Sequence, residues 1–242
     1  SSPNVYLIDG GVKRHILSGP LLAAWTPGGQ QVNVVNDGYV NAITSGDDIS
    51  SYLADVSGQL YVMDTNKITV PASLDTAYRN AGTVHSVSST LVNLFPTIAT
   101  ATGFLKGKSS PQLYLLDNSG QRRYIGSADT MTLYGGYQTG VTIVADSIVN
   151  AFPSSSALGI YVNDGTTNYV MEGGQKATFD ATTATNWGLG TAQQYTDGTL
   201  SRFTTGSALD SKLKSGSLYY LIREGKAFVT IDQNIANVWA ID

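Results

Sequence analysis

One large aromatic residue recurs in every stretch of roughly fifty residues, and these aromatics are the side chains best suited to ligand chemistry. They are Trp25, Tyr78, Tyr134, Trp187 and Trp239. Aromatic rings stack on the C–H faces of sugars, so all five are candidate ligand-binding residues. The alternative is that each ring fills the space between neighbouring repeats, because one such side chain buries about 150–250 Å². The sequence favours this packing role and leaves the binding role open.

A second recurring pattern places an acid at the end of one strand and a cation at the start of the next. The acids are Asp9, Asp64, Asp117 and Glu172, and the cations are Lys13, Lys67, Arg122 and Lys176. We expect an ion pair at the end of a hairpin, or an acid that accepts hydrogen bonds from the turn. An exposed ion pair stabilises a fold by only about 0–1 kcal/mol. The alternative is a ring of polar contacts to a ligand.

The residue types that carry most enzyme chemistry are scarce. Cysteine is absent, and the two histidines, His15 and His85, occupy non-equivalent places in the chain. Asp47 and Asp48 are the only adjacent carboxylates, and the sequence has no Gly-x-Ser-x-Gly nucleophile elbow. Two histidines are too few for a histidine-rich metal site. We therefore expect a protein that is not an enzyme and that has no cofactor and no metal site.

These residues must be positioned by a repeated unit, whose anchor is a strand with a central tyrosine. The anchor tyrosines recur at intervals of roughly 50–55 residues: Tyr6, Tyr61, Tyr114, Tyr169 and Tyr219. A tight turn rich in Gly or Asn and a second strand follow each anchor, which predicts a β-hairpin. Two further Asn-Asp-Gly segments, residues 36–38 and 163–165, are interpreted as turns rather than as calcium loops.

A helix-like piece that carries the recurrent aromatic follows each hairpin, and further extended stretches complete the unit. The anchor strands are apolar throughout, as is typical of strands covered on both faces. Repeats of about four strands with short helical turns, five in number, predict an all-β fold, a five-bladed β-propeller. We expect one domain over residues 1–242, with repeats at about 1–50, 51–102, 103–158, 159–211 and 212–242. The first and last repeats are incomplete, so either the termini share a blade that closes the ring or the sequence is part of a longer protein.

The motif of this unit is an aromatic-apolar strand, then Asp-Gly-Gly, then Lys-Arg-aromatic-Ile. Residues 5–16 and 113–125 show it best, whereas residues 176–179 and Arg223 depart from it. The motif resembles repeats of bacterial secreted and cell-wall-associated proteins. Its period is similar to that of the five-bladed tachylectin-2-like propellers, which are lectins. The resemblance extends over nearly the whole chain and implies a propeller fold.

Charge and composition bear on the partners and the compartment. The net charge is −4 and only 13% of residues are charged, so a basic surface that captures nucleic acid is not expected. No apolar stretch is long enough for a transmembrane helix, so we expect no membrane insertion. The abundance of Ser, Thr, Gly and Ala with few Lys favours a secreted or cell-surface protein.

The first functional hypothesis is a non-catalytic, extracellular, lectin-like module that binds a carbohydrate or a cell-wall polymer. Equivalent sites around a ring suit a repetitive target, because several weak contacts reinforce one another. The alternative is a protein-interaction, adhesin or assembly module of a larger surface protein, which an exposed apolar patch would favour. A glycan-active enzyme is the least favoured reading.

Overall fold

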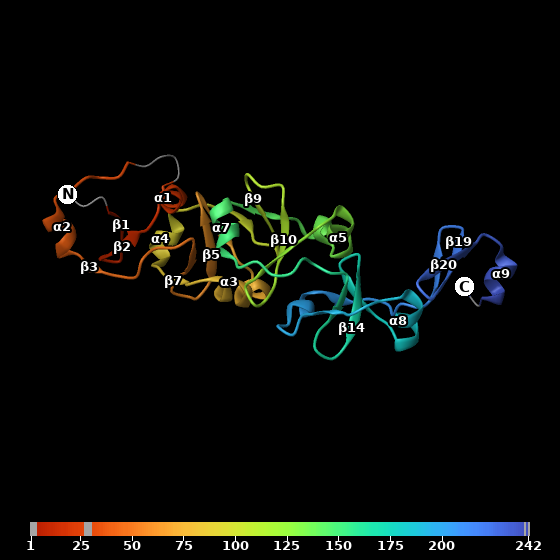
Figure 1. Cartoon of the computed structure of the whole chain (residues 1–242). Coiled ribbons are helices and arrows are strands. Elements are labelled where there is room, and N and C mark those ends of the chain that lie inside the picture. The colour runs from red at the N-terminus through yellow and green to blue at the C-terminus, as the bar shows by residue number, and fades with distance from the viewer. Residues whose placement is uncertain (1–3, 27–30, 240, 242) are drawn as a thin grey trace. The chain divides into compact units, whose positions relative to one another are not determined.

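The fold is known from a computed structural model that describes residues 4–26, 31–239 and 241 (Figure 1). The chain divides into two compact units. The first unit comprises Ser1–Gly126 and Thr139–Ala157, and the second comprises Ser127–Gln138 and Leu158–Asp242. The predicted repeats follow one another along the chain and share one order of elements, although not every repeat contains all of them.

A β-hairpin forms the centre of every repeat, as predicted. In each hairpin the anchor strand pairs antiparallel with the return strand that follows the turn. The anchor strands are β1 (Val5–Asp9), β5 (Leu60–Asp64), β10 (Leu113–Leu116), β14 (Asn168–Glu172) and β19 (Leu218–Arg223). The return strands are β2 (Val12–Ile16), β6 (Asn66–Thr69), β11 (Arg122–Tyr124), β15 (Gln175–Thr178) and β20 (Lys226–Thr230).

Two-residue turns close the hairpins of the first, fourth and fifth repeats, and both turn residues have a positive φ. The φ angles are 57° and 81° at Gly10 and Gly11, and 56° and 83° at Gly173 and Gly174. This is the geometry of the type I′ turn, which matches the twist of the flanking strands and favours glycine. In the fifth repeat Glu224 takes the first turn position with a φ of 52°.

Further strands flank each hairpin. An incoming strand pairs antiparallel with the anchor strand in the second to fifth repeats. These incoming strands are β4 (Tyr52–Ala54), β9 (Phe104–Gly107), β13 (Tyr161–Asn163) and β18 (Lys212–Ser215). A short strand then pairs parallel with the incoming strand: β7 (His85–Ser86), β12 (Thr142–Val144) or β16 (Gln193–Gln194). Another pairs parallel with the return strand: β3 (Thr44–Ser45), β8 (Thr97–Thr100) or β17 (Thr204–Thr205).

Short helices connect these strands. The helix after each hairpin carries or adjoins the recurrent aromatic: α1 (Gly19–Trp25), α3 (Asp75–Ala81, preceded by η1, Ala72–Leu74), α5 (Ala128–Leu133), α8 (Ala181–Trp187) and α9 (Gln233–Val238). Four of these helices begin at a Ser or Asp whose side chain accepts a backbone N–H: Ser18, Ser127, Asp180 and Asp232. A second helix adjoins the parallel strands. It follows β12 in α7 (Asp146–Ala151), precedes β3 in α2 (Asp37–Ala42), and lies between two such strands in α4 (Ser89–Asn93) and η2 (Thr199–Arg202). An additional helix, α6 (Gly136–Thr139), follows α5.

The prediction of a five-bladed β-propeller is wrong. The described residues form five separate mixed sheets of three to five strands, and none of them closes into a ring with the others. The stretch after the aromatic helix was expected to be extended. In the second repeat it divides into two strands joined by a helix, and the two strands lie on opposite edges of the sheet. The order in the second repeat, β7-β4-β5-β6-β8, shows this directly. The termini share no blade, because β1 and β19 lie in different sheets.

The hydrophobic cores of the first unit lie between successive repeats rather than inside each one. One core joins Ile16 and Trp25 of the first repeat to Leu53, Met63 and residues of α4 in the second. Another joins the second repeat to the third, with β5 and β6 on one side and α7 on the other. The anchor strands are therefore apolar on both faces because neighbouring repeats and helices cover them. Burial on both faces is found mainly in β5 and β14, whereas Ile8 of β1 is 53% exposed, and the covering elements are not propeller blades.

Candidate functional site

Three of the five recurrent aromatics are buried. Trp25, Tyr78 and Tyr134 each expose at most 3% of their surface, whereas Trp187 and Trp239 are half-buried. Burial raises the pKa of the Tyr78 hydroxyl well above its ordinary value. At the three buried positions the structure gives the aromatic ring a packing role. A ligand-binding role for the five side chains stays a prediction.

Each buried aromatic contacts a phenylalanine of the following repeat. The ring centroids are 5.4 Å apart for Trp25 and Phe95, and 5.5 Å apart for Tyr78 and Phe152. Tyr134 and Phe203 repeat the contact at 5.4 Å, and all three pairs meet edge to face. Edge-to-face pairs are favourable because the positive edge of one ring meets the negative face of the other. The three phenylalanines recur at one position per repeat, and that spacing was the available signal for these contacts.

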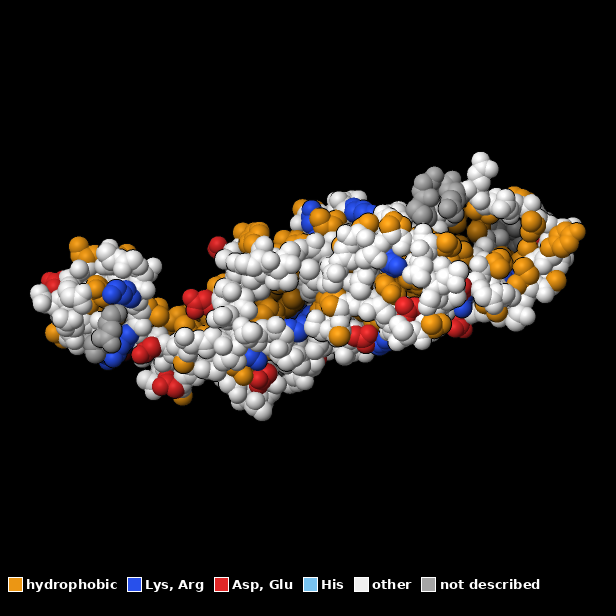
Figure 2. Space-filling model, turned by 180° about the vertical axis from the view of Figure 1, so that it is seen from behind, with side chains coloured by type: hydrophobic (Ala, Val, Ile, Leu, Met, Phe, Trp, Pro, Cys, Tyr) orange, Lys and Arg blue, Asp and Glu red, His pale blue; other side chains and the backbone are white. Residues whose placement is uncertain are grey.

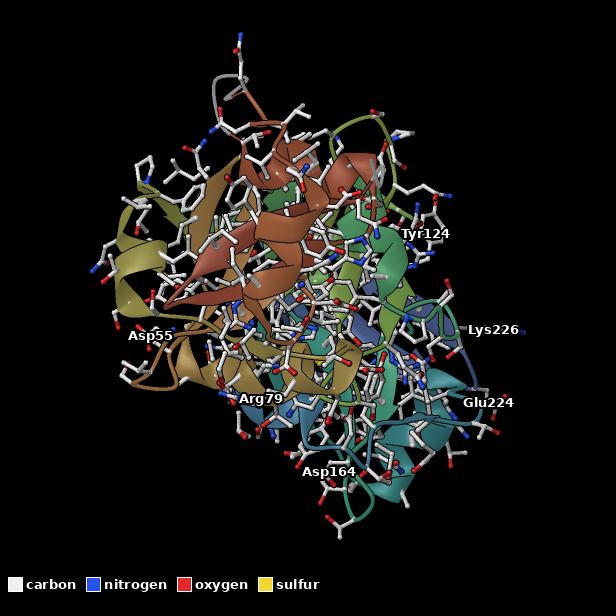
Figure 3. All side chains as sticks on the ribbon, turned by 90° about the vertical axis from the view of Figure 1, so that its left-hand side faces the viewer. Asp55, Arg79, Tyr124, Asp164, Glu224 and Lys226 are labelled. Atoms are coloured by element: carbon white, nitrogen blue, oxygen red, sulfur yellow. The ribbon has the colours of Figure 1, made fainter. Side chains whose placement is uncertain are left out.

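The turn of each later repeat lies against the end of the aromatic helix before it. The backbone N–H of Thr65 donates to the carbonyl of Ala24 at 3.1 Å. Gly174 donates to Leu133 at 2.9 Å, as Gly225 does to Asn186 at 2.7 Å. In the third repeat the contact differs, because the Asn80 side chain donates to the carbonyl of Asn118 at 2.8 Å. Figure 3 shows the side chains of Glu224, in one such turn, and of Lys226, directly after it, pointing outward.

Two of the acids at the strand ends also bond to the following repeat. A carboxylate oxygen of Asp9 accepts the backbone N–H of Ser88 at 3.1 Å, and Asp64 accepts that of Ala145 at 3.1 Å. Ser88 and Ala145 are the residues at which α4 and α7 begin. We use the word joint for the three contacts between successive repeats: ring on phenylalanine, turn on helix end, and acid on helix start. Asp9 and Asp64 therefore contribute to the contacts between successive repeats, whereas Asp117 bonds to Gln121 and Arg123 of its own repeat.

The cations that begin the return strands lie over the anchor tyrosines. The Lys67 ammonium is 5.2 Å from the Tyr61 ring centroid, and Lys176 is 4.9 Å from that of Tyr169. Lys13 over Tyr6 and Arg122 over Tyr114 repeat this arrangement. The predicted ion pairs form instead with other cations: Asp9 with Arg14 at 3.3 Å, Asp64 with Lys108 at 2.8 Å, and Asp117 with Arg123 at 2.9 Å.

Two loop carboxylates have perturbed titration. In Asp164 one carboxylate oxygen accepts the backbone N–H groups of Thr167 and Thr166, and these bonds lower the pKa of the carboxyl group. Asp55 is similar, and its pKa is lowered chiefly by the Ser57 hydroxyl. The other oxygen of Asp164 accepts the Tyr169 hydroxyl at 2.9 Å. The interpretation of residues 163–165 as a turn is confirmed, and within the described ranges no cluster of three His, Asp or Glu forms a metal site.

The known proteins offer little guidance. No family model matches the chain, and no curated protein matches it. Among solved structures, a chain of the periplasmic assembly from the ESX-5 inner membrane complex is similar over 74% of this chain and 69% of that chain. The two are 11% identical, with a TM-score of 0.20. A similarity this weak carries no argument about fold or function.

The N-terminal repeat exposes several apolar side chains that lie close together in the sequence. Val34 is 89% exposed and Tyr39 is 75% exposed. We call this the N-terminal surface, which comprises Val32, Val34, Val35 and Tyr39. In Figure 2, hydrophobic side chains gather over the N-terminal elements at the right. In the second to fourth repeats the corresponding segment forms β7, β12 or β16 on an incoming strand, whereas residues 31–36 pair with no strand among the described residues.

The C-terminal repeat exposes a second apolar surface on β20 and α9. This C-terminal surface comprises Phe228, Val229, Ile231, Ile235 and Val238, of which Val238 is 85% exposed. In the described part of the chain, no strand pairs with the outer edge of β20, although β2, β6 and β15 are each paired there. Among the described helices, none has the length and apolar character needed to cross a membrane.

Proposed function

We propose that this chain is a non-catalytic protein-interaction module of a secreted or cell-surface protein, which binds a partner through its N-terminal repeat. The N-terminal surface supports this role, because soluble proteins rarely leave contiguous apolar side chains exposed unless they bind something. The scarcity of catalytic residue types in the sequence agrees with a binding role. The main argument for sugar binding was a closed ring of repeats with equivalent sites, and the described sheets do not form such a ring.

The free edge of the first sheet, at β1, is suited to binding by strand addition. β1 is the outermost strand of its sheet, whereas β5, β10, β14 and β19 each pair with an incoming strand on that side. An extended partner segment would gain main-chain hydrogen bonds from β1 and apolar contacts from side chains nearby. The partner chemistry is a short extended segment that begins with an aromatic and an aliphatic residue, as β4, β9 and β13 do.

A synthetic peptide with the sequence of residues 103–108 tests this role, because it reproduces β9 and carries two lysines that keep it soluble. Fluorescence anisotropy of the labelled peptide should show saturable binding to the dilute protein. The same peptide with Pro in place of Leu105 is the control, since proline removes the N–H that a strand pair needs. Equal signals for the two peptides would refute strand addition, and Val34→Asp should weaken binding of the first peptide only.

A further inference from the structure

An arginine of the first repeat bridges the acid at the strand end and the outer edge of the sheet. Arg14 donates through Nε to a carboxylate oxygen of Asp9 at 3.3 Å, and through a terminal nitrogen to the main-chain carbonyl of Asp47 at 3.4 Å. The arginine side chain is only 12% exposed. Its planar group therefore fills the space between the end of the anchor strand and the segment that follows β3.

The third repeat contains the same bridge. Arg123 donates through Nε to Asp117 at 2.9 Å, and through a terminal nitrogen to the hydroxyl of Ser156 at 2.8 Å. The registers of the two hairpins place Arg14 and Arg123 at the same position of the repeat. In both repeats one nitrogen of the planar group meets a carboxylate, and another meets an oxygen at the sheet edge.

The fourth repeat has an alanine, Ala177, at this position of the hairpin register. The space that an arginine fills in the first and third repeats is here a cavity of about 220 Å³. Glu172, Gln175, Ala177 and residues 206–209 line it. The cavity has room for several water molecules at about 30 Å³ each, and so for a guanidinium group.

The outer wall of this cavity follows the same main-chain path as in the first repeat. The N–H groups of Gly206 and Leu209 donate to two carbonyls of β15, at 3.1 and 2.7 Å. The donors are three residues apart and the acceptors only two, so the chain bulges outward between the donors. In the first repeat, Gly46 and Ile49 bond to β2 in the same way. The residue after the glycine, which here is Ser207, therefore lies where the first repeat accepts its arginine.

The polar groups around the cavity are available to a ligand. In the described part of the chain, no hydrogen bond or ion pair engages the carboxylate of Glu172, the side-chain amide of Gln175 or the hydroxyl of Ser207. Ala177, at the floor, is 4% exposed. A negative charge and two neutral oxygens thus surround a small apolar floor.

The second repeat shows how an acid is paired when this arginine is lacking. Ile68 holds the position there, and Asp64 forms an ion pair at 2.8 Å with Lys108 of the third repeat. Counted from the residue that pairs with the leucine before the anchor tyrosine, the corresponding residue of the fifth repeat is Ser217. Glu172 is therefore left without a cation by two residue types inside the chain, an alanine at the arginine position and a serine at the lysine position.

We propose that the cavity of the fourth repeat binds a guanidinium group, supplied by an arginine side chain of a partner or by free arginine. Glu172 pairs with the charge, and the hydroxyl of Ser207 and the amide oxygen of Gln175 accept further N–H groups. Lysine offers one compact charge rather than a planar set of donors, so the site favours arginine over lysine. This site goes beyond the proposed function and shares no residue with the N-terminal surface or β1.

Proton–nitrogen correlation NMR of the labelled protein tests the proposal. The capped peptide Gly-Gly-Arg-Gly-Gly should shift the signals of the Gly206 and Ser207 amides and of the Gln175 side chain in a saturable way. The capped peptide Gly-Gly-Lys-Gly-Gly should bind at least about tenfold more weakly, which corresponds to about 1.4 kcal/mol. Free arginine distinguishes the two sources. Equal or tighter binding of free arginine supports a small-molecule site, and weaker binding supports a site for a partner's side chain.

Two variants and their matched controls identify the contacts. Glu172→Gln should weaken binding of the arginine peptide at least about tenfold, because a charged hydrogen-bond partner is lost. Glu224→Gln makes the same change in the turn of the fifth repeat and should bind as the wild type does. Ala177→Arg rebuilds the bridge of the first and third repeats and should abolish binding. Thr182→Arg adds the same charge at an exposed position of α8 and should leave binding unchanged.

Stability provides a second readout. Ala177→Arg should raise the urea midpoint of the second unit, measured by the fluorescence of Trp187, and this rise should disappear when Glu172→Gln is also present. A wild type that does not bind the arginine peptide, equal binding of the lysine peptide, undiminished binding by Glu172→Gln, or a rise that persists in the double variant would overturn the proposal. Peptide binding at β1 is measured separately, so these outcomes leave the proposed function standing.

Discussion

Gly120 provides the sharpest test of the joints, because its backbone touches the preceding repeat. A Cβ added there would lie 2.5 Å from the amide nitrogen of Ala81 and 2.6 Å from the carbonyl carbon of Asn80. Its φ is 75°, which costs a non-glycine residue about 1–2 kcal/mol. The hairpin of the third repeat must also move away from α3. That movement removes the hydrogen bond between Asn80 and Asn118, which contributes about 0.5–1.5 kcal/mol. We therefore expect Gly120→Ala to destabilise the first unit by about 2–3 kcal/mol.

Gly58→Ala is the matched control for this prediction. Gly58 has a φ of 87°, but an added Cβ would meet nothing within 4 Å, so only the backbone penalty applies. Urea unfolding followed by tryptophan fluorescence measures both changes. With Trp187 and Trp239 replaced by Phe, the remaining Trp25 reports on the first unit alone. Equal shifts of the urea midpoint for Gly120→Ala and Gly58→Ala would show that the approach of the two repeats contributes no stability, and would refute the reasoning.

Three further predictions concern single side chains. Tyr78→Ala should lower the free energy of unfolding, measured in urea, by about 3–5 kcal/mol, because it leaves a cavity in a core shared by two repeats. Trp187→Ala should lower it clearly less, because that ring is half-buried. A double-mutant cycle of Lys67→Met and Tyr61→Leu should return a coupling of about 1–2 kcal/mol, as a partly desolvated cation–π contact does; a coupling of zero would contradict that contact. The pKa of Asp164 is lower in the folded protein than in the unfolded chain, where it is about 3.9. Its hydrogen bonds therefore stabilise the fold fully at pH values above about 3.9, and this stabilisation is lost as the pH falls through the folded-state pKa. Urea midpoints measured down to acid pH should therefore fall less steeply in Asp164→Asn than in the wild type.

The repeat, its hairpins and its turns were predictable because they depend on local residue types. Tyrosine-centred apolar strands and Gly-Gly turns specify a hairpin whatever surrounds it. Ring closure was not predictable in this way, since it depends on how each repeat is rotated against the next. That rotation is set by a few contacts such as Thr65 on Ala24 and Gly225 on Asn186, in which the main chain supplies both the donor and the acceptor. Backbone groups leave almost no signature in the sequence.

The candidate site was harder to predict than the fold. The recurrent aromatics were identified correctly as repeated positions, and their packing role at Trp25 and Tyr78 follows from the partner rings of Phe95 and Phe152. The N-terminal surface was missed, because Val34 looks like any strand valine in the sequence. Its exposure depends on whether residues 31–36 pair with a strand, and among the described residues they do not, which composition does not record.

The joints make the repeats exchangeable. Successive repeats contact one another through a turn on a helix end, in three cases with an aromatic pair and in two cases with an acid as well, so each repeat interacts mainly with the repeats on either side of it. Duplication or loss of one whole repeat would leave every remaining joint with both of its halves. The gene for such a protein can therefore gain or lose length in steps of one repeat through recombination, without new contacts having to evolve at the seam.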